Sequence, residues 1–161
     1  MIAKKVLLVG DFGVGKTSLI NRFVFNEFSK AYISTIGVRV SSKVIFEGDS
    51  EVNLLIWDVA GVNGDEKIPS AYFLGASAAL YVFDLTREET YKNIKEQIAS
   101  LLEVSGLKKI FVVGNKKDLL TTEELEAVIN VIAIPIDLLT SAKEDENVTK
   151  IFERLALFAL N

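Results

Sequence analysis

Apolar residues are distributed along the chain in different patterns, and each pattern predicts a type of secondary structure. Short unbroken apolar runs, such as residues 6–9, are typical of buried strands, whereas apolar residues spaced three or four apart indicate helices. Alternation of apolar and polar residues over most of 38–46, followed by a polar turn at 47–50 and an apolar segment at 52–57, predicts a hairpin. The expected strands cover residues 4–10, 38–46, 52–57, 78–83, 107–114 and 131–136, and the expected helices cover 16–25, 67–74, 90–102, 123–129 and 148–160.

This order of elements predicts an α/β fold of three layers. Strands joined by helical connections pair in parallel, and the early hairpin adds an antiparallel strand at one edge. We therefore expect a mostly parallel sheet of about six strands with about five helices on its faces. All of it would form a single domain over residues 1–161. In open sheets of this kind, ligands bind beyond the carboxyl ends of the strands.

The composition narrows the chemistry available to these 161 residues. Half of them are apolar and a quarter are charged, as in ordinary globular domains. The net charge of −4 argues against nucleic acid or an anionic membrane surface as a partner. The sequence has no cysteine and no histidine, so catalysis would depend on positioning, fixed dipoles and a hard cation such as Mg²⁺. The N-terminal apolar run is too short for a signal peptide or a membrane span, and we expect a cytoplasmic protein.

A glycine-rich segment separates the first expected strand from the first expected helix. Residues 10–17 match the phosphate-binding pattern G-x-x-x-x-G-K-T. Glycines let the backbone curl so that successive N–H groups and the helix N-terminus face an anion. Lys16 would reach the terminal phosphates, and Thr17 would ligate the Mg²⁺ that bridges them. The expected phosphate-binding residues are Gly10, Asp11, Gly13, Val14, Gly15, Lys16, Thr17 and Ser18.

Two further loops are expected at the same edge of the sheet. They are Asn115-Lys116-Lys117-Asp118 and, after the last strand, Thr140-Ser141-Ala142-Lys143. Taken alone, the first tetrapeptide is explained at least as well by an ordinary solvated loop. Its place after a strand favours guanine recognition, because Asp118 would accept hydrogen bonds from guanine N1–H and the exocyclic amine, a donor pair that adenine lacks. The backbone N–H of Ala142 would face guanine O6.

These motifs resemble, in order and spacing, those of the Ras-like small GTPases over essentially the whole chain. The resemblance rests on residues 10–17, Thr35 before Ile36-Gly37, residues 57–61, Asn115 to Asp118, and Ser141 to Lys143. The features most similar to the Rab branch are Thr35-Ile36-Gly37-Val38, Trp57 before Asp58, and residues 70–76. The resemblance implies a P-loop NTPase G domain that binds GTP and GDP with Mg²⁺.

The resemblance also implies roles for individual residues. Thr35 would complete the Mg²⁺ shell when a γ-phosphate is present, Asp58 would hold Mg²⁺ through water, and the N–H of Gly61 would meet the γ-phosphate. Phe28 resembles the aromatic residue that packs against guanine, although a staple at the end of the first helix explains it equally well. Tyr32 resembles the tyrosine that closes over the phosphates, with simple exposure as the alternative. The expected base-binding residues are Asn115, Lys116, Asp118, Ser141, Ala142 and Lys143.

Two departures from the family pattern fall at the expected reaction centre. Val62 stands where the family has a glutamine that orients the attacking water, and valine neither donates nor accepts a hydrogen bond. Phe12 stands in the phosphate loop where a small residue is usual, and its ring would obstruct an arginine supplied by an activating protein. Relaxed selection at both loop positions is the alternative. We expect slow hydrolysis, with Lys16, Thr35 and Gly61 as the remaining catalytic groups.

Other departures concern partners. Two expected switch loops, residues 27–37 and 60–74, would contact protein effectors and activating or exchange proteins. Val40 replaces an aromatic residue of the Rab effector patch, which leaves Trp57 and Tyr72, and Leu74 replaces a common arginine. The chain ends at Asn161 without the polar tail and cysteines that anchor Ras and Rab proteins, so we expect no membrane anchor in it, whether truncated or naturally unprenylated. A prokaryotic origin fits this feature, and we expect a monomer.

The sequence therefore predicts a GTP-binding molecular switch that hydrolyses GTP slowly to GDP and phosphate. One alternative is an interaction module that stays loaded with GTP because it hardly hydrolyses it. A second alternative is a P-loop ATPase or kinase, for which Asp118 would have to be incidental.

Overall fold

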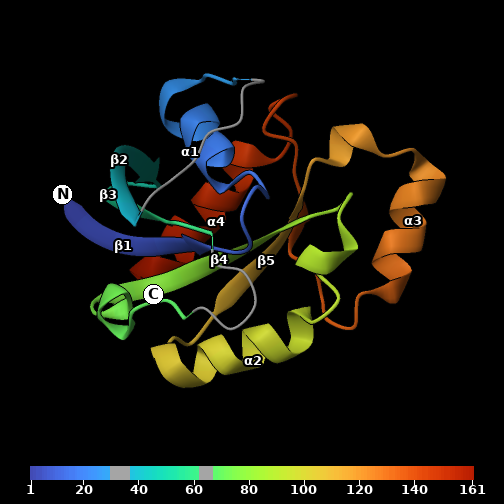
Figure 1. Cartoon of the computed structure of the whole chain (residues 1–161). Coiled ribbons are helices and arrows are strands. Elements are labelled where there is room, and N and C mark those ends of the chain that lie inside the picture. Colours follow the sequence, from blue (N-terminus) through green and yellow to red (C-terminus); the bar gives the residue numbers. More distant parts are fainter. Residues whose placement is uncertain (30–36, 62–66) are drawn as a thin grey trace.

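The computed structural model of the chain describes residues 1–29, 37–61 and 67–161, and it has the expected α/β architecture (Figure 1). One six-stranded sheet runs through the molecule in the order β2-β3-β1-β4-β5-β6. The strands are β1 (Ile2–Val9), β2 (Val38–Glu47), β3 (Ser50–Val59), β4 (Ala76–Asp84), β5 (Ile110–Asn115) and β6 (Leu138–Leu139).

The direction of each strand follows from how it is connected to the next. β1 runs parallel to both of its neighbours, β3 and β4, and the pairs β4–β5 and β5–β6 are also parallel. β2 and β3 form the predicted antiparallel hairpin, paired from Val38 with Val59 to Glu47 with Ser50. The carboxyl ends of β1, β3, β4 and β5 therefore lie at one edge of the sheet, where a ligand is expected.

Helices cover both faces of the sheet. In the described ranges they are α1 (Lys16–Phe25), α2 (Ile94–Ser105), α3 (Thr122–Val131) and α4 (Val148–Leu160). α1 and α4 pack on one face, and α2 and α3 pack on the other, which gives three layers (Figure 1). None of the helices in the described ranges is long and apolar enough to cross a membrane.

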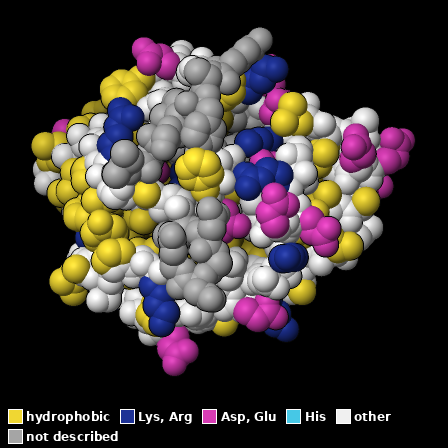
Figure 2. All heavy atoms as spheres, in the orientation of Figure 1, with side chains coloured by type: hydrophobic (Ala, Val, Ile, Leu, Met, Phe, Trp, Pro, Cys, Tyr) yellow, Lys and Arg dark blue, Asp and Glu magenta, His cyan; other side chains and the backbone are white. Residues whose placement is uncertain are grey.

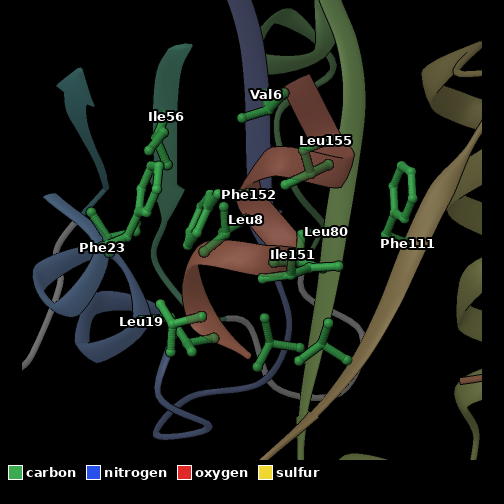
Figure 3. Packing of buried hydrophobic residues seen from close by; sticks show 14 of the residues in the cluster. Val6, Leu8, Leu19, Phe23, Ile56, Leu80, Phe111, Ile151, Phe152 and Leu155 are labelled. Carbon is green, nitrogen blue, oxygen red and sulfur yellow. The ribbon is translucent and has the colours of Figure 1, made fainter. Parts of the chain in front are cut away.

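The face covered by α1 and α4 is held by aromatic and aliphatic side chains. Phe23 of α1 stacks on Phe152 of α4 with ring centroids 4.3 Å apart. Figure 3 shows this pair among Leu8, Ile56 and Ile151, all of which are fully buried. Because α1 follows the phosphate-binding segment directly, this packing fixes the helix N-terminus at the carboxyl edge of the sheet.

The predicted strand over residues 131–136 is wrong. α3 begins with a capping box between Thr121 and Glu124 and continues to Val131, and the sixth strand is only Leu138–Leu139. The apolar residues of this segment, Ile132, Ile134 and Ile136, instead pack against the apolar cluster on the α2 and α3 face. The apolar pattern therefore reflected core packing and not pairing in the sheet.

Two predicted helices also differ from the structure. Among the described residues of the expected helix over 67–74, only Ser70–Phe73 is helical, as a single 3-10 turn. The helix expected over 90–102 begins later than predicted. Thr90 belongs to a 3-10 turn at Glu88–Thr90, and α2 begins only at Ile94. The Thr90 hydroxyl accepts a hydrogen bond from the N–H of Asp84 at 3.0 Å, and this contact stabilises the separate turn at the end of β4.

Candidate nucleotide-binding site

The glycine-rich loop between β1 and α1 lies against two neighbouring strands. Gly10 has a φ of 145°, and a Cβ atom there would stand 2.2 Å from the carbonyl oxygen of Val82 in β4. Gly15 has a φ of 101°, and a Cβ atom there would stand 2.2 Å from the side-chain nitrogen of Asn115 at the end of β5. Only glycine fits either position, so these two residues determine the path of the loop.

The loop presents backbone donors at the N-terminus of α1. Within the described residues, the N–H groups of Gly13, Val14 and Gly15 donate to no backbone carbonyl group. Gly15 is the N-cap of α1, no side-chain hydrogen bond caps this end, and the first turn holds no acidic residue. Ser18 follows in the same first turn and is half-buried. This arrangement fits an anion, which would accept from the loop and complement the helix dipole.

The Lys16 side chain lies folded back against the same loop. Its ammonium group donates to the carbonyl oxygens of Gly10 and Asp11, both at 2.9 Å, and the residue is only 6% exposed. Burial lowers the pKa of Lys16 to about 8, although Asp58 and Asp11 favour the charged form. A phosphate beside this ammonium group would replace lost hydration with opposite charge, which is what a triphosphate site requires.

Thr17 and Asp58 are the described residues that the sequence predicts to hold Mg²⁺. The Thr17 hydroxyl donates to Asp58 Oδ2 at 2.5 Å, and both residues are buried, one in α1 and one at the end of β3. Hydroxyl and carboxylate oxygens are the ligands that Mg²⁺ prefers. No cluster of three or more acidic side chains that could hold a metal occurs across residues 1–29, 37–61 and 67–161. The donor set therefore fits a Mg²⁺ ion that takes further ligands from phosphate and water.

Asn115 ties three loops together from the end of β5. Its side-chain amide donates to the carbonyl oxygen of Val14 at 3.0 Å and accepts from the Thr140 hydroxyl at 3.0 Å. Lys116 adds a second contact to the phosphate loop, donating to the carbonyl oxygen of Gly13 at 2.9 Å. These contacts hold the phosphate loop next to the two loops expected to bind the base.

The expected base-binding residues also meet. The Ser141 hydroxyl donates to Asp118 Oδ1 at 2.7 Å, which orients a carboxylate that stays exposed. Arg22 of α1 supports the same loop by donating to the carbonyl oxygens of Ala142 and Lys143, both at 2.9 Å. Ala142 is buried at 3% exposure. Phe28 is half-buried and packs against the core beneath α1 and α4.

Gly61 and Phe12 are adjacent at the other end of the phosphate loop. A Cβ atom on Gly61 would stand 2.4 Å from Phe12 Cα and 2.5 Å from Phe12 N. The Phe12 residue itself is 41% exposed. Tyr32, Thr35 and Val62, the other residues expected here, lie outside the described residues.

Sequence reasoning missed the residues that support the site from behind. Arg22 and Asp84 each contact a loop that the motifs identified, yet neither of them belongs to the matched pattern. Asp84 ends β4, so its position at the carboxyl edge was the available signal. Nothing in the sequence pointed to Arg22, whose contacts span 120 residues of chain.

The surface near β2 and β3 carries the residues expected to form an effector patch. Trp57 and Tyr72 lie with ring centroids 6.1 Å apart, and the Lys5 ammonium group stands 3.6 Å from the centre of the Trp57 ring. Val40 and Leu74 are 52% and 74% exposed. Figure 2 shows hydrophobic side chains gathered on the side where β1, β2 and β3 lie.

Comparison with known proteins finds relatives of this chain that cover most of its length. Residues 5–160 match the Ras family. The chain is 38% identical over 157 residues to Ras-related protein SEC4 of Saccharomyces cerevisiae, covering 94% of this chain and 73% of that protein. It is 42% identical over 122 residues to human Ras-related protein Rab-25, covering 75% and 57%. With Ras-related protein RABA1f of Arabidopsis thaliana the identity is 41% over 129 residues, covering 76% and 59%.

The chain thus spans less than two thirds of the length of Rab-25 and RABA1f, and most of the length of SEC4. The match runs from Lys5, within β1, to Leu160 at the end of α4, and it includes all three loops at the carboxyl edge of the sheet. This chain therefore belongs to the Ras family of small GTPases and is most similar to its Rab branch.

Proposed function

We propose that this chain is a GTP- and GDP-binding switch that requires Mg²⁺ and hydrolyses GTP slowly. The observation that carries the proposal is the position of Asn115, whose side chain contacts Val14 in the phosphate loop and Thr140 beside the base loop. The Asn115 side chain therefore holds the phosphate loop close to the loop proposed to bind the base. The match to the Ras family over residues 5–160 supports the same function and a single domain.

The proposal gives the residues of the candidate site the following physical roles. The N–H groups after Phe12 bind phosphate oxygens, and the Lys16 ammonium group stabilises charge on the terminal phosphates. Thr17 and Asp58 provide oxygen ligands for Mg²⁺, which when bound would neutralise charge on the phosphates. Asp118, oriented by Ser141, selects guanine.

Slow hydrolysis is proposed because of two side chains. Val62 offers no group to orient water, and Phe12, whose backbone lies against Gly61, carries an aromatic side chain where the phosphate loop usually has a small residue. The same two residues favour a second candidate, a GTP-loaded module that hardly hydrolyses. The nucleotide extracted from freshly purified protein separates the two candidates, because GDP indicates turnover and GTP indicates the module.

The experiment that tests the proposal is a thermal melt in Mg²⁺ with different nucleotides. GTP and GDP should each stabilise the protein by about 2.7 kcal/mol when present at about a hundred times the dissociation constant. ATP at the same concentration should leave the midpoint unchanged. Equal stabilisation by ATP would favour the ATPase or kinase alternative and would remove Asp118 as the base reader.

We extend the proposal to partners. Residues 27–37 and 60–74 would report the phosphate state to protein effectors and to activating or exchange proteins, with the chain acting as a monomer. The net charge of −4 supports protein partners over nucleic acid. A cytoplasmic location stays a prediction from the sequence.

A further inference from the structure

Three consecutive carbonyl groups of the phosphate loop each accept a hydrogen bond from a distant side chain. The pairs are Arg87 Nη1 to Phe12 O at 2.9 Å, Lys116 Nζ to Gly13 O at 2.9 Å and Asn115 Nδ2 to Val14 O at 3.0 Å. A C=O group and the next N–H group point in opposite directions across a trans peptide bond. Each contact therefore also orients one N–H of the loop away from the donor side chain.

Asp84 connects two of these donors. Its side chain is fully buried at the end of β4, where Oδ2 lies 2.8 Å from Lys116 Nζ and 4.0 Å from Arg87 Nη1. Its Oδ1 atom accepts from the Thr86 N–H at 2.8 Å and from the Thr86 hydroxyl at 2.6 Å. Glu89 also pairs with Arg87, at 3.1 Å from Nε. One buried carboxylate thus directs two cations towards adjacent carbonyl groups of the loop.

We propose that Arg87 and Asp84 are positioning residues of the phosphate loop, with Arg87 orienting the peptide between Phe12 and Gly13 for the terminal phosphate of GTP. This inference rests on the proposed function. It adds two residues that support the phosphate loop and that belong to none of the sequence motifs. Arg87 acts through the backbone and touches no nucleotide itself. Asp84 holds Arg87 and Lys116 together, so it supports two successive peptides of the loop.

The assignment to the terminal phosphate follows from the position of Gly61. A Cβ atom on Gly61 would stand 2.5 Å from Phe12 N and 2.9 Å from Asp11 C, so Gly61, the residue expected to meet the γ-phosphate, lies against the peptide between Asp11 and Phe12. The peptide that Arg87 holds is the next one along the loop, and of the three held peptides it is the nearest in sequence to this contact. The peptides held by Lys116 and Asn115 lie closer to Lys16 and serve GDP and GTP alike. Loss of Arg87 should therefore weaken GTP binding more than GDP binding.

The test compares affinities for GDP and a non-hydrolysable GTP analogue in Mg²⁺. Arg87→Ala should lower the affinity for the analogue about tenfold and leave the GDP affinity within about threefold. Arg87→Lys, which keeps a cation and a donor, should recover part of the loss. Asp84→Asn should weaken both nucleotides because it releases Lys116 as well. Arg154→Ala is the matched control, since Arg154 donates to the carbonyl oxygen of Asp137 at 3.1 Å on an exposed surface.

A second measurement reports the loop directly. The ¹H–¹⁵N signal of Gly13 in the GDP complex should shift in Arg87→Ala and stay unchanged in Arg154→Ala. An unchanged affinity ratio in Arg87→Ala, an unchanged Gly13 signal, or an equal effect of Arg154→Ala would overturn the inference while leaving the proposed function intact. Failure of the unmodified chain to bind either guanine nucleotide would overturn the proposed function and the inference with it.

Discussion

Gly61 lies so close to Phe12 that a Cβ atom on Gly61 would stand 2.4 Å from the Cα atom of Phe12. The segment that follows β3 and the phosphate loop are therefore in direct backbone contact at the place where a terminal phosphate is expected. An aromatic side chain with 41% exposure begins at this contact. We therefore propose Phe12 as the side chain whose replacement changes hydrolysis with the least change to the rest of the nucleotide site.

The first prediction concerns the rate of GTP cleavage. Phe12→Gly and Val62→Gln together should raise the single-turnover rate at least about tenfold, because a water-orienting amide is gained and the aromatic ring of the phosphate loop is lost. The measurement is phosphate release from pre-loaded GTP. Val44→Gln on β2 is the matched control, since Val44 is 40% exposed and distant from the loop in sequence. A double variant that cleaves GTP no faster than the unmodified chain would show that these two residues do not limit hydrolysis.

The second prediction concerns the base. Asp118→Asn should shift the preference from guanine to xanthine nucleotides, because an amide donor suits the C2 carbonyl of xanthine and the Ser141 hydroxyl can still donate to its oxygen. Competition between GDP and xanthosine diphosphate measures the change. Asp145→Asn removes the same charge from an exposed residue of the neighbouring loop and should leave the preference unchanged. Undiminished guanine affinity in Asp118→Asn would mean that another residue reads the base.

The third prediction concerns Mg²⁺. Thr17→Ala removes the hydroxyl that donates to Asp58 at 2.5 Å, so release of GDP should no longer be slowed by Mg²⁺. The loss of this buried hydrogen bond should also destabilise the protein by about 1–3 kcal/mol. The measurement is release of a fluorescent GDP with Mg²⁺ and with a chelator. Thr149→Ala, at an exposed position of α4, serves as the control, and an equal Mg²⁺ effect in Thr17→Ala would contradict the prediction.

The fourth prediction concerns the packing that holds α1 in place. Phe152→Ala should lower the free energy of unfolding by about 3–5 kcal/mol, because the ring is fully buried and stacks on Phe23. Phe46→Ala, at a residue that is 73% exposed, should change it by less than about 0.5 kcal/mol. Urea unfolding of the GDP-saturated proteins measures both values. Similar losses in the two variants would show that the stacked pair carries little of the stability.

The sequence predicted most elements of the fold because most of them bury a face that has a regular period. The run over residues 6–9 is at most 1% exposed, and the hairpin pairs as its alternation indicated. The prediction failed at residues 131–136, where the partly buried Ile132, Ile134 and Ile136 pack against the apolar cluster after α3 without joining the sheet. Apolar pattern reports burial, and burial alone does not distinguish a strand from an irregular segment packed on a helix face.

Some residues of the candidate site could likewise be predicted from the sequence, and others could not. Residues 10–17 and Asn115 to Asp118 could be predicted as phosphate- and guanine-binding segments from sequence, because such binding demands certain residue types at fixed spacing. Arg22, Asp84 and Arg87 were not identified, because their contacts join segments that are far apart along the chain and impose no local pattern.

Local spacing along the sequence was enough to predict the α/β class and the family, and the same spacing predicts which residues bind phosphate, Mg²⁺ and guanine. The folded structure was needed to see which carbonyl groups of the phosphate loop accept hydrogen bonds, and from which side chains. Asp84 reaches Lys116, and Arg87 reaches Phe12, only after β4 and β5 lie beside the loop that follows β1. Such contacts depend on the arrangement of parallel strands in the sheet, and strand order is a property of the folded chain.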